Sequence, residues 1–495
     1  MAAHASFSAP PAHNESVRGY APGSAERASL QKTLERMAGE RIEIASVIGG
    51  KRVTTGATHP SVMPHDHGHV LADIHMAGAA EADRAIEAAL AARKEWASTP
   101  WPERAAIFLR AAELLSGPWR DTLNAATMLG QSKTVHQAEI DSACELIDFF
   151  RFNVEYMTRI YAEQPLSSPG VWNRLEYRPL EGFVFAVSPF NFTSIAGNLP
   201  TSVALMGNTV VWKAAETAAF SAHQLMRLFE AAGLPPGVIN LVHGPGSTIG
   251  EAVIRHPELA GIHFTGSTEV FRWMFEEVGT NISRYRGYPR LVGETGGKNF
   301  VLAHPSADVD ELVAAVVRGG FEYQGQKCSA VSRLFVPDAM WPEVSGKVAA
   351  EVDSIRMGDV RDFGNFMGAV IDKAAWERHR DAIEEARRDP ETEILAGGEV
   401  DDSVGWFVTP TVVVTRNPDF RLLKEELFGP IVTAYVYEER RWPEMLDLID
   451  RQTPYALTGS IFAHDRRAIE EAEQALVNAA GNFYINDKPT GAVVG

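Results

Sequence analysis

The chain has 495 residues, and its 64 Asp and Glu residues outnumber the 46 Lys and Arg residues, which gives a net charge of −18. A surface of this sign repels a phosphate backbone, so the composition disfavours nucleic acid as a partner. No apolar run approaches the ~20 residues that a membrane-crossing helix needs, and the sequence therefore predicts a folded protein without a membrane-spanning segment.

The first 29 residues are rich in Ala, Pro and Ser and lack the continuous apolar segment of a secretory signal. Glu15 and Glu26 disfavour a mitochondrial presequence, which is normally rich in Arg and poor in acids. Only two cysteines occur, Cys144 and Cys328, too few for a disulfide framework. These features predict a cytoplasmic protein that begins with a loose arm.

Apolar residues recur at helical spacing from Ala79 to Ala125, and a third helical stretch runs from His136 to Gln164 before a break at Pro165 to Gly170. From Phe183 the pattern changes to short β-branched runs that alternate with helices, which is typical of a parallel, doubly wound sheet. A second α/β stretch follows. We therefore predict two α/β domains joined near Gly296 to Phe300.

The segment YQGQKCSAVSRLFV places Cys328 in a loop just before a strand, where its side chain can face a cleft. A thiol with an ordinary pKa near ~8.5 is only slightly ionised at neutral pH, so a catalytic cysteine needs local help. Taken alone, an isolated cysteine is more often an inert core residue. Cys144, which lies in a helical apolar pattern, is predicted to be one.

Two further polar residues follow strands. Glu294, in RLVGETGGKNFVL, stands at a strand end before a pair of glycines, where a carboxylate can act as a general base or simply cap a helix. Asn191, in AVSPFNFTSIAGNLP, offers a neutral amide donor for an oxyanion, with an ordinary turn residue as the alternative.

Lys213 and Glu216, in VVWKAAE, and Gly266 and Ser267, in HFTGSTEVFRW, each follow a predicted strand. They are expected at the carboxyl edge of the sheet, where dinucleotides bind. Lys213 can hydrogen-bond ribose hydroxyls, Glu216 would repel a 2′-phosphate and so favour NAD over NADP, and the amides near Gly266 and Ser267 suit a pyrophosphate.

Seven segments, in a fixed order, resemble the aldehyde dehydrogenase family over essentially the whole chain from about residue 45. They are SPFNF, VVWKAAE, FTGST, GETGGKN, GQKCSA, KEELFGP and NFYINDKPTG. Within the family, SPFNFTSIAGNLP, CELIDFFRFN and GQKCSAVSR resemble the 1-pyrroline-5-carboxylate dehydrogenase branch. The resemblance implies an α/β fold with a Rossmann-like parallel-sheet NAD domain, an α/β catalytic domain and a small oligomerisation element.

The resemblance also implies a division of the chain into parts. These are an N-terminal arm (1–40), an NAD-binding domain (41–160 and 180–298), an incomplete oligomerisation arm (161–179 and 482–495) and a catalytic domain (299–481).

By the same resemblance Cys328 is the nucleophile, Glu294 the general base and Asn191, with the backbone N–H of Cys328, the oxyanion donor. The implied cofactor is NAD, with no metal. Its contacts would come from Ser188, Lys213, Glu216, Gly266, Ser267, Glu426 and Phe428, and the substrate pocket from Glu145, Phe192 and Ser329.

The activity implied is NAD-dependent oxidation of L-glutamate γ-semialdehyde to L-glutamate through a thiohemiacetal and a thioester. The small-molecule aldehyde would be the only partner besides further copies of the chain, in a homodimer or higher homo-oligomer if the final oligomerising strand is present. Three alternatives stay open at this point: another aldehyde substrate, a non-redox thiol esterase, and a truncated homologue that cannot bind the substrate.

Two departures from the family pattern stand out. Phe271 occupies a position where the family often has glycine. The chain also ends at Gly495, where family members continue through a Gly/Ala/Ser-rich loop and a final oligomerising strand, and we expect weaker anchoring of the substrate carboxylate as a result. A third feature, PHDHGHV with His65, His67 and His69, is interpreted as a surface loop rather than a metal site.

Overall fold

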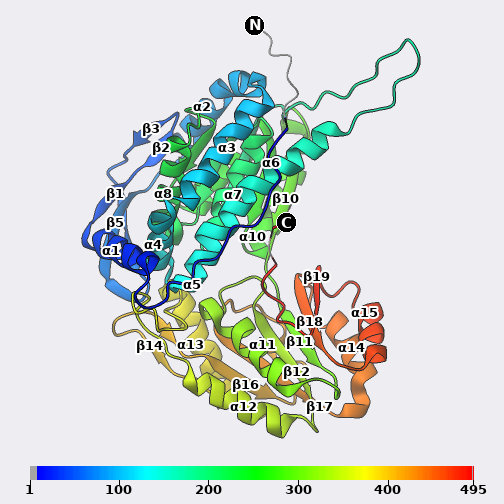
Figure 1. The fold of residues 1–495 in the computed structure, drawn as a ribbon. Helices are drawn as coiled ribbons and strands as arrows, with labels where there is room; N and C mark the ends of the chain where they lie inside the picture. The colour runs from blue at the N-terminus through cyan, green and yellow to red at the C-terminus, as the bar shows by residue number, and fades with distance from the viewer. Residues whose placement is uncertain (1–7, 493) are drawn as a thin grey trace.

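Two seven-stranded sheets, each covered by helices, divide the protein (Figure 1). The computed structural model describes residues 8–492 and 494–495. The first sheet has the order β10-β9-β6-β7-β8-β2-β3 and the second the order β13-β16-β17-β12-β11-β18-β19. The first draws its strands from the first 294 residues and the second from residue 299 onward, which agrees with the predicted junction near Gly296 to Phe300.

The five strands from β6 to β10 are parallel, and β2 and β3 extend the sheet in antiparallel pairing. Because β6 lies between β7 and β9, the winding direction reverses beside β6, and sheets of this kind bind ligands at the carboxyl ends of the strands beside that point. The strands are β2 (Ser46–Ile48), β3 (Lys51–Val53), β6 (Phe183–Ser188), β7 (Thr209–Ala214), β8 (Ile239–Val242), β9 (Leu259–Thr265) and β10 (Arg290–Glu294).

Helices cover both faces of this sheet, as the apolar runs predict. One face packs Trp212 against Phe108, Phe150 and their neighbours, and the other packs Phe185 against Ile86 and its neighbours. The helices are α2 (Ala79–Ser98), α3 (Trp101–Ser116), α4 (Arg120–Gln131), α5 (Val135–Ala138), the π-helical turn η1 (Glu139–Glu145), α6 (Leu146–Ala162), α7 (Thr193–Leu205), α8 (Ala219–Ala231), α9 (Gly246–Ile254) and α10 (Thr268–Thr280).

The second sheet is parallel except for its edge strand β13. Its strands are β11 (Asn299–Ala303), β12 (Val331–Pro337), β13 (Thr392–Ala396), β16 (Thr411–Thr415), β17 (Ile431–Tyr437), β18 (Thr458–Phe462) and β19 (Asn482–Ile485). The helices are α11 (Val309–Phe321), α12 (Trp341–Ser354), α13 (Lys373–Arg388), α14 (Trp442–Arg451) and α15 (Arg466–Ala475), and β14 (Val400–Asp401) pairs with β15 (Phe407–Val408). Since β19 pairs with β18 in register, residues 482–485 belong to this sheet, which corrects their expected place in an oligomerisation arm.

The described part of the N-terminal segment is not the loose arm that its composition predicts. In Figure 1 its dark-blue trace runs along α6 before it enters α1 (Ala25–Gly39). Glu15 forms ion pairs with Arg120 and Arg151 at 2.8 Å, and its backbone N–H donates to Asp148. Composition could not reveal these contacts because the partners lie more than 100 residues away in the sequence.

The histidine-rich run is also not a surface loop. Asp66 begins β5 (Asp66–His75), the central strand of a small sheet with β1 (Ile42–Ile44) and β4 (Thr58–Met63). His65 is only 2% exposed, and its Nδ1 lies 3.2 Å from Ser132 Oγ. Burial lowers the pKa of His65 to about 4, so this ring is a neutral structural group at physiological pH.

Residues 163–178 leave the body of the protein after α6 and project as a long loop (Figure 1). The predicted break at Pro165 to Gly170 is confirmed, since α6 ends at Ala162. The loop exposes large apolar side chains, with Leu166 94% and Trp172 78% exposed. Within the described residues no helix is long and apolar enough to cross a membrane.

Candidate active site

Cys328 follows a tight turn whose residues have left-handed backbone conformations, which residues other than glycine rarely adopt. Tyr323, Gln324 and Gly325 all have positive φ, of 51°, 55° and 64°. A Cβ on Gly325 would lie 2.3 Å from the carbonyl oxygen of Gly429, so only glycine fits there. The side chain of Gln324 donates to Ser132 O and Ala369 O and fixes the turn. This strained turn aims Cys328 at the interface of the two halves.

The thiol of Cys328 is protonated in this environment. Burial, followed by the nearby carboxylates of Glu294 and Glu426, raises its pKa to about 12. The backbone N–H groups of Cys328 and Ser329 face the sulfur and offset part of this rise. The local help that a catalytic thiol needs is therefore a proton acceptor rather than a neighbouring cation.

Glu294 is that acceptor. It is the last residue of β10, and the thiol of Cys328 donates to its Oε1 over 3.9 Å. Burial raises the pKa of Glu294 from its ordinary value, which suits a group that must both take and release a proton. Its backbone carbonyl accepts a hydrogen bond from Gly266 N at 3.2 Å, so the base is tied directly to the loop after β9.

Asn191 joins the two sheets. Its amide group is 3% exposed, and its Nδ2 donates to the carbonyl of Gln326 at 3.0 Å, two residues before Cys328. An amide nitrogen carries two hydrogens, so one donor remains for another acceptor. The structure thus brings the side chains of Cys328 and Glu294 together, and holds Asn191 against the cysteine loop.

The residues expected at the dinucleotide site lie at or just after the carboxyl ends of β6, β7 and β9. Lys213 Nζ lies 3.5 Å from Glu216 Oε1, and a Cβ on Gly246 would lie 3.6 Å from that same ammonium. Lys213 therefore reaches the N-terminus of α9. Ser267 caps α10, where its Oγ accepts from Val270 N, and Ser188 Oγ at the end of β6 accepts from Trp212 Nε1.

Phe271, the departure from the family pattern, has a packing role. Its ring stacks on Phe264 at 5.3 Å with an angle of 11° between the ring planes. The same ring lies where a side chain on Gly293 would be, since a Cβ there would come within 2.2 Å. Gly293 of β10 has no side chain and so leaves room for the Phe271 ring. Ser267 remains the N-cap of α10.

Glu426 and Phe428 enter from the second half. Glu426 Oε1 accepts from Gly297 N at 2.7 Å, and its carboxylate fills the space that a Cβ on Gly296 would need. Phe428 has a positive φ of 60° and sets its ring edge-on to Phe190 at 5.7 Å. Gly296 therefore leaves the space into which Glu426 reaches, whereas Gly297 is needed beside the Cys328 carbonyl, which would lie 2.4 Å from a Cβ there.

The three expected pocket residues lie in different surroundings. Glu145, in η1, accepts from Ser194 Oγ at 3.0 Å, and burial followed by the charge of Asp141 raises its pKa to about 7. The Phe192 ring packs under the ammonium of Lys133 at 4.1 Å. Ser329 Oγ donates to Thr490 Oγ1 at 2.8 Å.

Sequence patterns missed three residues near these positions: Lys133, Asp141 and Thr490. Lys133 and Asp141 are buried and paired at 2.7 Å, although Lys133 precedes the predicted helical stretch that begins at His136 and Asp141 lies within it. Thr490 lies in the NFYINDKPTG segment, so its presence in a matching segment was the one available signal.

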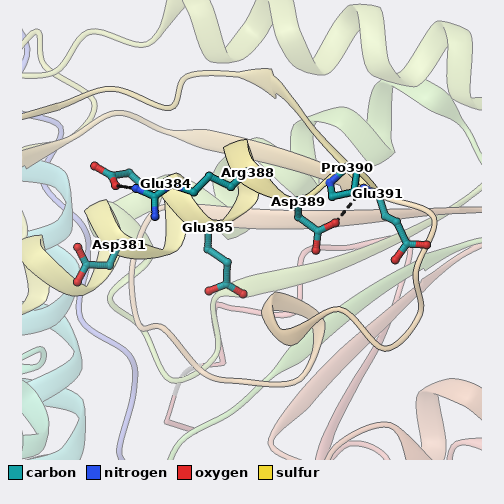
Figure 2. A pocket seen from close by; sticks show the side chains of 7 residues that line it. All are labelled: Asp381, Glu384, Glu385, Arg388, Asp389, Pro390 and Glu391. Carbon is teal, nitrogen blue, oxygen red and sulfur yellow. Dashed lines mark hydrogen bonds and ion pairs between the residues drawn. The ribbon is translucent and has the colours of Figure 1, made fainter.

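A surface hollow far from Cys328 in the sequence is a weaker candidate for a substrate site. It lies at the end of α13 and the turn after it, and shares no residue with the set around Cys328 (Figure 2). Its lining is Asp381, Glu384, Glu385, Arg388, Asp389, Pro390 and Glu391. Five carboxylates against one guanidinium repel an anionic substrate, and the described residues hold no group of three or more metal-ligating side chains.

The chain belongs to the aldehyde dehydrogenase family, whose model matches residues 53–495. It is 48% identical to the mitochondrial delta-1-pyrroline-5-carboxylate dehydrogenase of Mus musculus over 483 residues, which are 97% of this chain and 86% of the mouse protein.

Two solved structures share the fold. The delta-pyrroline-5-carboxylate dehydrogenase from Mycobacterium tuberculosis bound with NAD is 52% identical with a TM-score of 0.96, covering 100% of this chain and 91% of that one. The 1-pyrroline-5-carboxylate dehydrogenase from Thermus with bound NAD is 30% identical with a TM-score of 0.92, covering 99% and 93%. The predicted fold and the predicted resemblance to this branch are confirmed.

The raised pKa of Glu145 predicts a pH-dependent effect on stability. The folded protein holds this proton up to about pH 7, whereas the unfolded chain releases it near its ordinary pKa of 4.5, so ionisation costs stability as the pH rises between these values. Glu145→Gln removes this cost. Relative to the wild type, its thermal midpoint should rise by a few degrees between pH 5 and pH 8.

Differential scanning fluorimetry on both proteins measures this difference, and groups that titrate in both cancel. Glu163→Gln, at an exposed position, is the matched control and should show no such trend. An equal offset of Glu145→Gln from the wild type at both pH values would contradict the prediction.

Proposed function

We propose that this chain is an NAD-dependent dehydrogenase that oxidises L-glutamate γ-semialdehyde, the open form of 1-pyrroline-5-carboxylate, to L-glutamate in proline degradation. The observation that supports the chemistry best is the contact from the Cys328 thiol to Glu294, with Asn191 held against the same loop. The substrate follows from the names of the relatives, whose sequences match nearly the whole chain.

In the proposed mechanism the thiol proton passes to Glu294 while the sulfur of Cys328 forms a bond to the aldehyde carbon. The carbonyl oxygen becomes an alkoxide, which the free hydrogen of Asn191 Nδ2 and the backbone N–H of Cys328 stabilise. When bound, NAD accepts the hydride that leaves this carbon, and the product on the sulfur is a thioester.

The second half of the reaction is hydrolysis. Glu294 releases the thiol proton to solvent and then takes a proton from water, which attacks the thioester and breaks the carbon–sulfur bond. Glutamate leaves, and Glu294 passes the proton that it took from water to the sulfur, which restores the thiol of Cys328. One carboxylate therefore serves both half-reactions, in keeping with a pKa that burial raises.

The residues at the carboxyl ends of β6, β7 and β9 fit NAD. Lys213 is largely buried, and its only ion-pair partner among the described residues is Glu216 at 3.5 Å, so both side chains have bonding capacity for ribose hydroxyls. The N-terminus of α10, capped by Ser267, suits the pyrophosphate, and Gly266, whose N–H is bonded to the Glu294 carbonyl, would let it approach the backbone. Ser188, Glu426 and Phe428 complete the proposed set of contacts.

The pocket residues Glu145, Phe192 and Ser329 favour a substrate with a polar end over a simple aldehyde. A carboxylate such as Glu145, once ionised, can pair with the α-ammonium of the semialdehyde, and the Ser329 hydroxyl offers a further hydrogen bond. A thiol esterase would use the same Cys328 and Glu294 but would not need NAD, so the dependence of turnover on NAD separates the two activities.

The expected domain division is retained as a proposal with one change: residues 482–485 join the catalytic domain, because β19 completes its sheet.

We also propose a cytoplasmic location, supported by two free cysteines, although the mouse relative is named as mitochondrial. Fractionation of the native host would decide the location.

Cys328→Ala should abolish NADH formation from the semialdehyde, since no other group near Glu294 can form the thioester. Glu294→Gln should lower turnover by about 10²–10⁴-fold, the typical contribution of a general base. The Gln also removes one of the charges that raise the pKa of Cys328, so some thiol can ionise at alkaline pH without a base, whereas water still lacks one, and acylated enzyme should accumulate in this variant. Absorbance at 340 nm and intact mass spectrometry report the two effects.

Cys144→Ala is the matched control, because this buried thiol contacts Arg120 and Glu139 rather than the site. It should keep near-normal turnover. Full turnover by Cys328→Ala would refute the proposed nucleophile.

Glu216→Ser should change cofactor preference. Removal of the carboxylate beside Lys213 ends its repulsion of a 2′-phosphate, so the ratio of kcat/KM for NADP to that for NAD should rise about tenfold, equivalent to ~1.4 kcal/mol. Steady-state kinetics with both cofactors measure the ratio. Glu230→Gln, which removes a carboxylate of α8 that pairs with Arg52, should leave it unchanged; an unchanged ratio in Glu216→Ser would count against the proposed ribose contact.

We further propose that the exposed loop of residues 163–178 contributes to a homo-oligomer, because a monomer would leave Leu166 and Trp172 in water. Trp172→Asp should lower the molar mass found by light scattering after size-exclusion chromatography. Val477→Asp introduces the same charge at another exposed apolar position and should leave the mass unchanged. A wild-type chain that is monomeric at micromolar concentration would overturn this proposal.

A further inference from the structure

A buried ion pair lies directly behind the loop that holds Asn191. Lys133 Nζ and Asp141 Oδ2 are 2.7 Å apart, and the two side chains are 0% and 1% exposed. Moving two charges from water into the protein interior costs free energy. This cost is offset only where the ion pair has good geometry and where further hydrogen bonds satisfy its remaining donors and acceptors. In this protein the further hydrogen bonds of Asp141 are made to the residues that directly follow the Asn191 loop.

Asp141 acts as a cap for α7 from outside that helix. Its Oδ2 accepts from Thr193 N at 3.0 Å and its Oδ1 from Ser194 N at 2.8 Å, the first two amides of α7. The N-cap residue of the helix, Phe192, offers no side-chain hydrogen bond. The start of α7 is therefore fixed by Asp141, a residue of η1 more than 50 positions earlier.

Lys133 connects this helix start to the cysteine loop. Its ammonium lies 4.1 Å from the centre of the Phe192 ring and 4.5 Å from that of Tyr323. Phe192 directly follows Asn191, and Tyr323 begins the left-handed turn that leads to Cys328. One desolvated cation thus contacts the aromatic side chains of both loops.

Neighbouring polar groups restrict the same loop further. Gln131 Nε2 donates to Phe190 O at 2.5 Å, and Thr193 Oγ1 donates to Gln131 Oε1 at 3.0 Å. The backbone is thereby held on both sides of Asn191, at Phe190 and at Thr193. The side chain of Asn191 has its own bond to Gln326 O, so its amide has little freedom to move.

We propose that the Lys133–Asp141 ion pair is a positioning element for the oxyanion donor: it sets the place of the Asn191 amide relative to Cys328, by capping α7 on one side and contacting both loops through Phe192 and Tyr323 on the other. This inference rests on the proposed role of Asn191. Both charged side chains are at most 1% exposed and so out of reach of a substrate, and both act through Asn191.

A double-mutant cycle tests this coupling. Asp141→Asn keeps the side-chain shape but leaves Lys133 without its counter-charge and one amide of α7 without its acceptor. In the wild-type background it should lower kcat at least about tenfold, since a misplacement of ~1 Å costs on the order of 10²-fold. In an Asn191→Ala background, where no donor remains to be positioned, it should lower kcat less than about twofold. KM for NAD should stay unchanged in both.

Two further variants separate positioning from loss of folding. Asp148→Asn is the matched control, a buried acid on α6 that holds the N-terminal segment through Asn14 and Glu15; it should lower the thermal midpoint without a selective loss in kcat. If Asp141→Asn does not fold, the pair Lys133→Met with Asp141→Asn leaves no unpaired buried charge and takes its place in the cycle.

Equal losses from Asp141→Asn in the two backgrounds, or a comparable loss in Asp148→Asn, would overturn the inference. The cycle is also run on the acylation of Cys328 by p-nitrophenyl acetate, which forms an oxyanion without NAD. A wild-type chain that is acylated by the ester but does not oxidise the semialdehyde refutes the proposed function, while the ester cycle still decides whether the ion pair positions Asn191.

Discussion

The hydrogen bond from Asn191 Nδ2 to the carbonyl of Gln326 links the loops on which the whole site depends. One loop follows β6 of the first sheet, and the other precedes β12 of the second. Parallel sheets present the carboxyl ends of their strands at one edge, and here the edge of the first sheet faces a loop of the second. The nucleophile and its proposed oxyanion donor therefore come from different halves of the chain.

The electrostatics of the site follow from this junction. Burial between two sheets makes a free thiolate unfavourable, and Glu294 and Glu426 add negative charge nearby, so the pKa of Cys328 rises rather than falls. The same burial raises the pKa of Glu294 above its ordinary value, which favours its taking up a proton. A protonated thiol that donates to a proton-accepting carboxylate is the consequence, and no cation beside the sulfur is needed.

Close approach at the junction is possible because several positions carry no side chain. Glu426 occupies the space above Gly296, Phe271 occupies the space above Gly293, and Gly325 passes within contact of the Gly429 carbonyl. Buried ion pairs, in turn, hold the elements around the junction rigidly in place. Lys133 pairs with Asp141 of η1, which caps α7 more than 50 residues later, and Glu15 pairs with Arg120 across 105 positions of the sequence.

The sequence by itself determined the fold class, the family and the proposed nucleophile, base and amide donor. Alternating β-branched runs and helical periods reflect local burial, and Cys328, Glu294 and Asn191 each stand in a short segment whose local pattern is distinctive. Only the tertiary structure decided the protonation of Cys328, the burial of His65, the fixed N-terminal segment, the place of β19 in the second sheet and the pairing of Lys133 with Asp141. Each of these depends on which residues meet across the fold, and burial and charge at a contact have no signature in the local sequence.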